Sequence, residues 1–171
     1  MRTRLRLTRA ITMVVVVILL RASHAADPAS LASAKPPSSK ELARGRYLVM
    51  ITGCNDCHTA GYAPSGGKVP EKEWLKGDAL GWRGPWGTTY AGNLRLYMQR
   101  LSEEQWVTVA KSFQTRPPMP WFNVNAMTES DLRALYRYVR SLGPPGDPAP
   151  TYVPSDKEPK PPFVQFPLPP K

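Results

Sequence analysis

The spacing of apolar residues predicts three helices in the central part of the chain. Each begins with a polar residue that can cap the helix and a second residue, three positions later, that can complete the cap: Ser38 with Glu41, Ser102 with Gln105, and Thr128 with Asp131. Apolar and small residues then recur three and four positions apart and share one helical face: Leu42, Gly45, Leu48, Val49 and Thr52; Trp106, Val109, Ala110 and Phe113; Leu132, Leu135, Tyr136, Val139 and Leu142. Gly143 and the two prolines after it end the third helix. The pattern predicts an all-α domain.

Residues 61–92 separate the first two helices and show no long period. They are rich in glycine, proline and tryptophan, and a loop of about 30 residues is unusual inside a small domain. A large prosthetic group would account for it, because loops can pack onto such a group instead of onto each other. The sequence therefore indicates helices and long loops wrapped around a bound group.

The chain begins with a segment typical of an exported protein. Arginines at positions 2, 4, 6 and 9 precede an apolar run over residues 10–20, and Ser23-His24-Ala25 places small residues where a signal peptidase cuts. The run is shorter than the roughly 20 apolar residues of a membrane-spanning helix. We predict a signal peptide over residues 1–26, cleaved after Ala25 or Ala26, and a periplasmic protein. An uncleaved membrane anchor is the alternative.

Two polar or proline-rich segments flank the domain, which we place at residues 38–143. Residues 27–37 consist mainly of alanine, serine and proline and predict a flexible lead-in. Residues 144–171 hold 11 of the 20 prolines, so this tail can form neither a helix nor a central strand. We expect it to run extended, either draped over the domain or free as a docking arm.

The charge of the chain argues against nucleic-acid binding. The formal net charge is +10, but residues 1–26 contain five arginines and no acid, so cleavage lowers the charge to +5. Basic residues are not clustered among aromatic ones, as a nucleic-acid interface requires. Some of them could steer an acidic protein partner.

The sequence Cys54-Asn55-Asp56-Cys57-His58 predicts covalent attachment of one haem. Cys54 and Cys57 are the two cysteines of the chain. Their thiols can add to the two vinyl groups of a porphyrin, and His58 then lies under the ring, where it can bind the iron. Export agrees with this, because haem is attached in this way outside the cytoplasm.

Three other interpretations of the motif are weaker. A thioredoxin-like redox pair requires a βαβ context, which the predicted helices do not provide. A disulfide between Cys54 and Cys57 closes so short a loop that it would stabilise little. A zinc site needs a fourth ligand, and the other histidine, His24, leaves with the signal peptide.

With His24 removed, either a methionine or no residue completes the iron coordination. Met1 and Met13 belong to the signal, Met50 is too close to the motif to cross the haem, and Met98 can be explained as core or lid. Met127 precedes the Thr128 cap, where it can pack on the following helix. Met119 lies in a run with three prolines, which hold the backbone extended and present one thioether stiffly. We predict Met119 as the ligand, with Met127 as the main competitor.

These motifs resemble class I c-type cytochromes, in which the haem motif comes early, a methionine followed by proline comes late, and a helix closes the domain. More narrowly, residues 84–94 (GPWGTTYAGNL) and 117–121 (PPMPW) are similar to the cytochrome domains that accompany membrane-bound bacterial alcohol and aldehyde dehydrogenases. Those subunits carry several haem motifs, whereas this chain has one. The resemblance covers about residues 40–143. It implies electron transfer, with Cys54 and Cys57 as thioether attachments and His58 and Met119 as axial ligands.

The resemblance also implies some internal contacts. The family usually crosses its first and last helices at small residues, a role that Gly45 would fill. The iron-binding histidine normally donates its other ring N–H to a backbone carbonyl, for which Pro70 and Pro64 are the candidates. Three aromatic side chains could donate hydrogen bonds to the haem propionates or only pack against the porphyrin ring. They are Trp82, Trp86 and Tyr90.

An iron with both axial positions filled is suited to moving single electrons. We therefore predict a periplasmic carrier, not an enzyme, that passes electrons between a dehydrogenase and a respiratory acceptor. The alternative is a haem enzyme or gas sensor in which Met119 dissociates, but no histidine of the mature chain could then act as a distal acid or base. A third possibility is a subunit that its tail holds in a larger redox complex.

Overall fold

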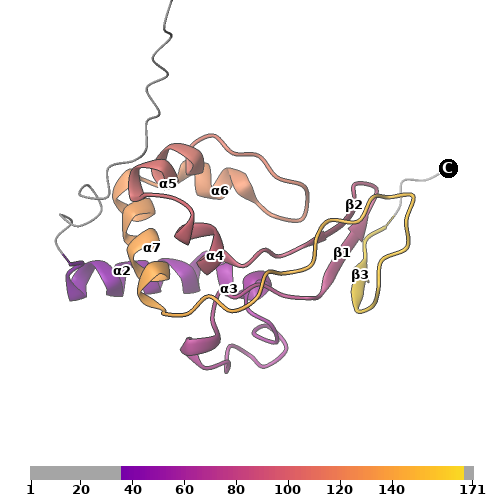
Figure 1. Cartoon of the computed structure of the whole chain (residues 1–171), viewed down its shortest axis with the longest axis horizontal. Helices are drawn as coiled ribbons and strands as arrows, with labels where there is room; N and C mark the ends of the chain where they lie inside the picture. Colours follow the sequence, from indigo (N-terminus) through magenta and orange to yellow (C-terminus); the bar gives the residue numbers. More distant parts are fainter. Residues whose placement is uncertain (1–35, 168–171) are drawn as a thin grey trace, which may run out of the picture. The chain divides into compact units, whose positions relative to one another are not determined.

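The structure, a computed structural model, describes residues 36–167 (Figure 1). The predicted signal peptide, residues 1–26, and the lead-in up to residue 35 lie outside these residues, as do residues 168–171. Within residues 36–167, no helix is both long enough and apolar enough to cross a membrane.

The described residues are mainly helical, as the sequence predicts. The helices are α2 (Ser39–Ile51), α3 (Cys54–His58), the 3-10 turn η1 (Glu71–Glu73), α4 (Leu94–Gln99), α5 (Glu103–Ala110), α6 (Trp121–Ala126) and α7 (Glu129–Ser141). Helices α2, α5 and α7 confirm the three predicted helices. Helices α4 and α6 have six residues each, too few to show a periodic pattern, and the sequence does not predict them.

Side-chain caps start the three predicted helices. At α2, Glu41 N donates to Ser38 Oγ over 3.3 Å, and Glu41 Oε2 accepts from Ser38 N over 2.7 Å. The start of α5 has the same reciprocal pair. At α7, Thr128 Oγ1 accepts from Asp131 N over 3.2 Å. The Asp131 carboxylate instead forms an ion pair with Arg44 of α2 at 2.8 Å, so this cap also links two helices.

Helices α2 and α7 cross at Gly45. A Cβ atom at this position would overlap the Ala134 carbonyl group and would lie 2.5 Å from Tyr138 Cβ. The two backbones approach this closely only because Gly45 has no side chain. The expectation that Gly45 lies at the crossing of the first and last helices is therefore confirmed.

One apolar core holds α2, α4, α5 and α7 together. Val49, Met98 and Leu132 are at most 1% exposed, and each comes from a different helix of this group. Trp106 of α5 packs in the same cluster and donates its indole N–H to Leu132 O over 2.9 Å. Cys54, the first residue of α3 (Cys54–His58), packs against this core.

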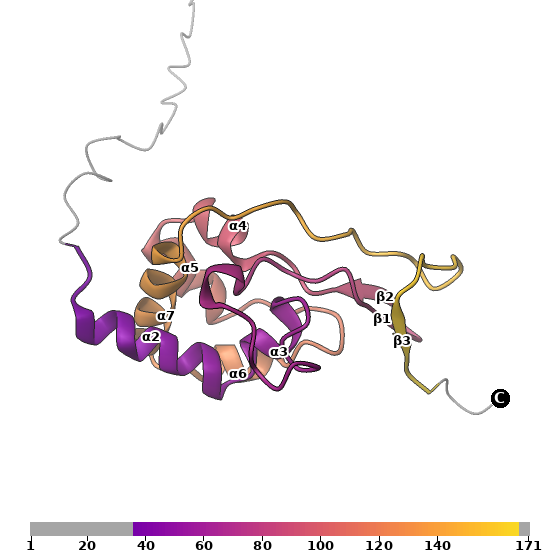
Figure 2. The ribbon, with the colours of Figure 1, turned by 90° about the horizontal axis from the view of Figure 1, so that it is seen from below.

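A small sheet interrupts the long region that the sequence predicts as a loop. Strands β1 (Gly81–Gly84) and β2 (Gly87–Tyr90) form an antiparallel hairpin, and β3 (Phe163–Gln165) pairs in parallel with β1, in the order β2-β1-β3. Figures 1 and 2 show this sheet at the end of the domain away from α2, α5 and α7. The strands have three or four residues, which is too short for an alternation of apolar and polar residues to predict them from the sequence.

The described part of the tail, residues 144–167, packs on the domain. After α7 it runs back along the domain and reaches the hairpin, where β3 forms the edge of the sheet (Figure 2). An edge position suits a proline-rich segment, because proline lacks the N–H that a central strand must donate. Of the two courses that the sequence leaves open, the structure shows the draped one.

Candidate functional site

Helix α3 carries the Cys54–His58 motif and begins at a sharp turn. Gly53, with a φ of +72°, adopts the left-handed conformation between α2 and α3, which residues with a side chain rarely adopt. The turn starts a new five-residue helix directly after α2. Cys54, Cys57 and His58 then line a common crevice.

Hydrogen bonds among buried groups fix α3 against the rest of the domain. Asn55 and Thr59 are each 1% exposed. Thr59 Oγ1 donates to Asn55 Oδ1 over 2.7 Å and accepts from Leu75 N over 2.7 Å. The polar residues between and after the cysteines therefore hold the helix in place, which leaves Cys54, Cys57 and His58 for the crevice.

The two cysteines are unpaired and half-buried. Burial raises the pKa of the Cys54 thiol and of the Cys57 thiol. A dithiol used for redox exchange requires the opposite shift, since the thiolate is the reactive form. The two thiols form no disulfide in the structure, and the raised pKa of each does not favour thiol–disulfide exchange.

His58 is oriented by a backbone carbonyl. Its Nδ1 lies 2.7 Å from Gly92 O, and because a carbonyl oxygen can only accept, Nδ1 carries the hydrogen. The prediction of Pro70 or Pro64 as this acceptor is wrong; Pro70 instead precedes the 3-10 turn η1 as its N-cap. Burial lowers the pKa of the imidazole, which keeps the ring neutral. Its Nε2 is then available to a metal ion.

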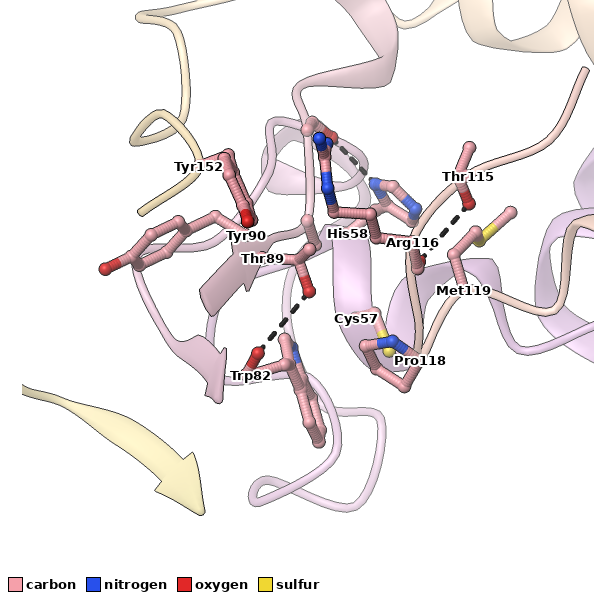
Figure 3. A pocket seen from close by; sticks show the side chains of 12 residues that line it. Cys57, His58, Trp82, Thr89, Tyr90, Thr115, Arg116, Pro118, Met119 and Tyr152 are labelled. Atoms are coloured by element: carbon pink, nitrogen blue, oxygen red, sulfur yellow. Dashed lines mark hydrogen bonds between the residues drawn. The ribbon is translucent and has the colours of Figure 1, made fainter. Parts of the chain in front are cut away.

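The crevice consists of two cavities of about 430 and 280 Å³. Both are lined by Cys57, His58, Gly92, Thr115 and Met119. The larger extends over Cys54, α4, α5 and α6, while the smaller is walled by the β1–β2 hairpin (Figure 3). The larger volume lies within the range of about 300–1,000 Å³ that is usual for cofactor pockets.

Met119 lies with His58 on the lining of both cavities. Thr89 Oγ1 of β2 donates to Pro117 O over 2.7 Å and ties the methionine loop to the hairpin. On the other side of Met119, its carbonyl accepts from Trp121 N over 2.9 Å. The loop that presents Met119 is thus fixed before and after this residue.

The other described methionines differ in position. Met98 and Met127 also line the larger cavity, but both belong to or pack against the apolar core, and Met98 is 1% exposed. Met50 is 44% exposed and lies outside the crevice, where its sulfur accepts from Arg46 Nη1 over 3.1 Å. The structure therefore leaves Met119 and Met127 as the residues to compare by experiment.

The three aromatic candidates separate into two groups. Trp82 and Tyr90 line the smaller cavity. Trp86 does not line it and packs on Phe166 of the tail, with ring centroids 5.2 Å apart. Its indole nitrogen is buried and has no hydrogen-bond partner among residues 36–167.

The donor set of the crevice fits a covalently attached haem. Two thiols three positions apart and a neutral imidazole lie along one side of a largely apolar crevice, and a thioether lies on the same lining. Within the described part of the chain, no group of three or more histidine, cysteine or acidic residues could hold a metal ion on its own. A structural zinc site is therefore not supported by residues 36–167.

Comparison with known families agrees with this geometry. The family model for cytochrome c matches residues 42–143, which is more than half of the chain. The chain belongs to the cytochrome c family. Its domain therefore binds haem covalently and serves haem-based electron transfer in general. Neither a curated protein nor a solved structure matches the chain significantly.

The sequence does not reveal several residues of the cytochrome crevice. Gly92 acts through its carbonyl, which every residue has, so its role depends on the fold alone. Asn93 is the N-cap of α4, where its side chain accepts from Leu96 N over 3.0 Å, but one capping residue without an apolar period does not predict a helix. Tyr152 lies beyond the matched region and has no recognisable motif.

Proposed function

We propose that this cytochrome is an exported single-electron carrier with one haem c. Cys54 and Cys57 would hold the haem through thioether bonds, and His58 and Met119 would be the axial ligands. The observation that supports this most strongly is that these four side chains line one crevice, with His58 already oriented by Gly92. The bound haem would supply a reversible one-electron change at its iron.

The residues of the chain would tune this electron transfer in two ways. The hydrogen bond from His58 Nδ1 to Gly92 O fixes the orientation of the ring. It also makes Nε2 more basic and therefore a stronger ligand for a metal ion. As an iron ligand, the thioether of Met119 would favour the reduced state, and methionine–histidine ligation would therefore raise the reduction potential. Met119 is favoured over Met127 because it lines both cavities with His58, whereas Met127 packs against the core.

The lining also favours a carrier over a haem enzyme. Peroxidase-like chemistry needs an acid or base on the distal side of the haem. Among the described residues that line the two cavities, none is aspartate or glutamate and His58 is the one histidine. A haem in this crevice would therefore have no carboxylic acid and no second histidine among these lining residues to act as a distal acid or base.

We propose the periplasm as the location and a dehydrogenase and a respiratory acceptor as the redox partners. The location rests on the predicted signal peptide, which lies outside the described residues. The partners rest on the resemblance of residues 84–94 and 117–121 to dehydrogenase-associated cytochrome domains. Both segments contribute residues to the wall of the crevice, among them Thr89, Tyr90 and Met119.

Intact mass of protein purified from the periplasm tests attachment and export together. We expect a chain that starts at Ala26 or Asp27 and carries the mass of one haem after denaturation, because thioether bonds survive unfolding. Cys54→Ala and Cys57→Ala should each leave at most one such bond and shift the reduced visible spectrum. Haem that extracts into acid–acetone from the wild type would contradict covalent attachment, and Met1 retained in the membrane fraction would contradict export of a cleaved protein.

A further inference from the structure

The tail contributes to the crevice although it lies outside the cytochrome c match. The family match ends at residue 143. Pro148, Ala149 and Pro150 line the larger cavity, and Tyr152 lines the smaller one. This wall is therefore an addition to the family domain, and its effect on the haem is not given by family membership.

Hydrogen bonds fix the tail on both sides of these wall residues. Before them, Asn93 Nδ2 donates to Pro145 O over 2.7 Å and to Asp147 O over 2.9 Å. After them, Thr88 and Val153 exchange two backbone hydrogen bonds, of 2.7 and 3.0 Å. The segment between is held at both ends like a strap, and β3 adds a further attachment to β1.

Two glycines of the domain make room for the strap. A Cβ atom at Gly77 would lie 3.0 Å from Ala149 Cβ, and one at Gly87 would lie 2.6 Å from Tyr152 Oη. Both glycines also have a positive φ, of +86° and +94°. A side chain is therefore disfavoured at each position by the backbone conformation as well as by the close contact with the tail. The close fit shows that the domain and the tail are built to pack together.

Tyr152 also contacts the loop that carries Met119. The guanidinium of Arg116 lies over the Tyr152 ring, 3.9 Å from its centroid, and Tyr152 Oη donates to Trp86 O over 2.9 Å. Arg116 comes three residues before Met119, and Figure 3 shows both beside the cavity that Tyr152 lines. The ring is thus held by the hairpin and in turn holds the methionine loop.

We propose that residues 144–153 are a strap over the haem crevice, and that Tyr152 is a positioning residue that keeps the Met119 loop closed. Stacking of Arg116 on the ring resists outward movement of the loop. Because a thioether ligand must leave before another molecule can bind the iron, the strap slows ligand exchange and shields the haem edge from water. This inference rests on the proposed ligation by Met119.

Cyanide binding to the oxidised holoprotein tests the role of Tyr152. Tyr152→Ala removes the stacked ring and should bind cyanide about two- to fivefold faster, the factor expected for loss of a surface cation–π contact. The weak long-wavelength sulfur-to-iron charge-transfer band should lose intensity. Tyr152→Phe keeps the stacked ring but loses the hydroxyl bond to Trp86 O, so its rate should lie between those of the wild type and Tyr152→Ala. Arg116→Gln removes the same contact from the loop side, and the double variant should be no faster than either single variant.

Tyr47→Ala is the matched control. Tyr47 is also an exposed tyrosine under an arginine, with Arg44 5.5 Å from its ring centroid, but it does not line the crevice. It should leave cyanide binding and the band unchanged. If Tyr47→Ala accelerates cyanide binding as much as Tyr152→Ala does, or if Tyr152→Ala and Arg116→Gln both bind at the wild-type rate, the strap is excluded. A wild type without the band would instead refute the ligation by Met119.

Discussion

Arg95 shows how a single side chain can join segments that are far apart in the sequence. It is 2% exposed, and its guanidinium donates hydrogen bonds to the backbone carbonyls of Glu71, Lys72, Trp74, Leu142 and Pro144. These carbonyls belong to the η1 turn, the end of α7 and the start of the tail. Burial lowers the pKa of the guanidinium, but the five carbonyl dipoles compensate for the water it has lost.

Replacement of Arg95 by lysine should therefore destabilise the holoprotein. A lysine amine cannot reach carbonyls spread around a planar guanidinium, so several of them would be left buried without a donor. We expect Arg95→Lys to lower the free energy of unfolding in denaturant by about 2–4 kcal/mol. Arg140→Lys, at an exposed position in the last turn of α7, should change it by less than about 0.5 kcal/mol. Equal effects of the two changes would show that the carbonyl contacts of Arg95 contribute little.

At the scale of elements, the predictable features are those that depend on neighbouring residues. The caps at Ser38, Ser102 and Thr128 lie within one turn of their partners, so the sequence is enough to predict α2, α5 and α7. Strand β3 is different, because it exists only through pairing with β1, about 80 positions earlier in the chain. Short strands formed by such distant pairing carry no local signal.

The crossing of α2 and α7 gives a prediction in which two known effects oppose each other. Alanine is favoured over glycine by about 1 kcal/mol inside a helix, so propensity alone predicts that Gly45→Ala stabilises the protein. The new Cβ would overlap the Ala134 carbonyl group, which belongs to the backbone and cannot turn away. Overpacking costs about 1–3 kcal/mol or more, and we expect a net loss of stability in denaturant unfolding.

Lys40→Ala is the control for the crossing, because Lys40 is exposed on the same helix. It should change the free energy of unfolding by less than about 0.5 kcal/mol. A Gly45→Ala variant that is more stable than the wild type would mean that the helices do not pack this closely.

At the scale of the whole molecule, the crevice is assembled from parts of the chain that are distant in the sequence. The haem motif, the hairpin, the methionine loop and the tail each contribute lining residues. The sequence identifies Cys54, Cys57 and His58 because their chemistry depends on close spacing, and it singles out Met119 because three prolines surround it. It does not identify Gly92 or Tyr152, since a backbone carbonyl and a tail residue acquire their roles only when distant segments meet.

The visible spectrum of Met119→Ala tests the central claim most directly. The oxidised wild type should show the weak long-wavelength sulfur-to-iron charge-transfer band, and Met119→Ala should abolish it, open the iron to carbon monoxide and lower the reduction potential. Met127→Ala, the control from the same cavity, should keep the band and cost only packing, about 1–3 kcal/mol of stability. The account predicts that Met119→Ala loses the band and that Met127→Ala keeps it. Two results would contradict the account: loss of the band in Met127→Ala alone, or a wild type that has no band and binds carbon monoxide readily.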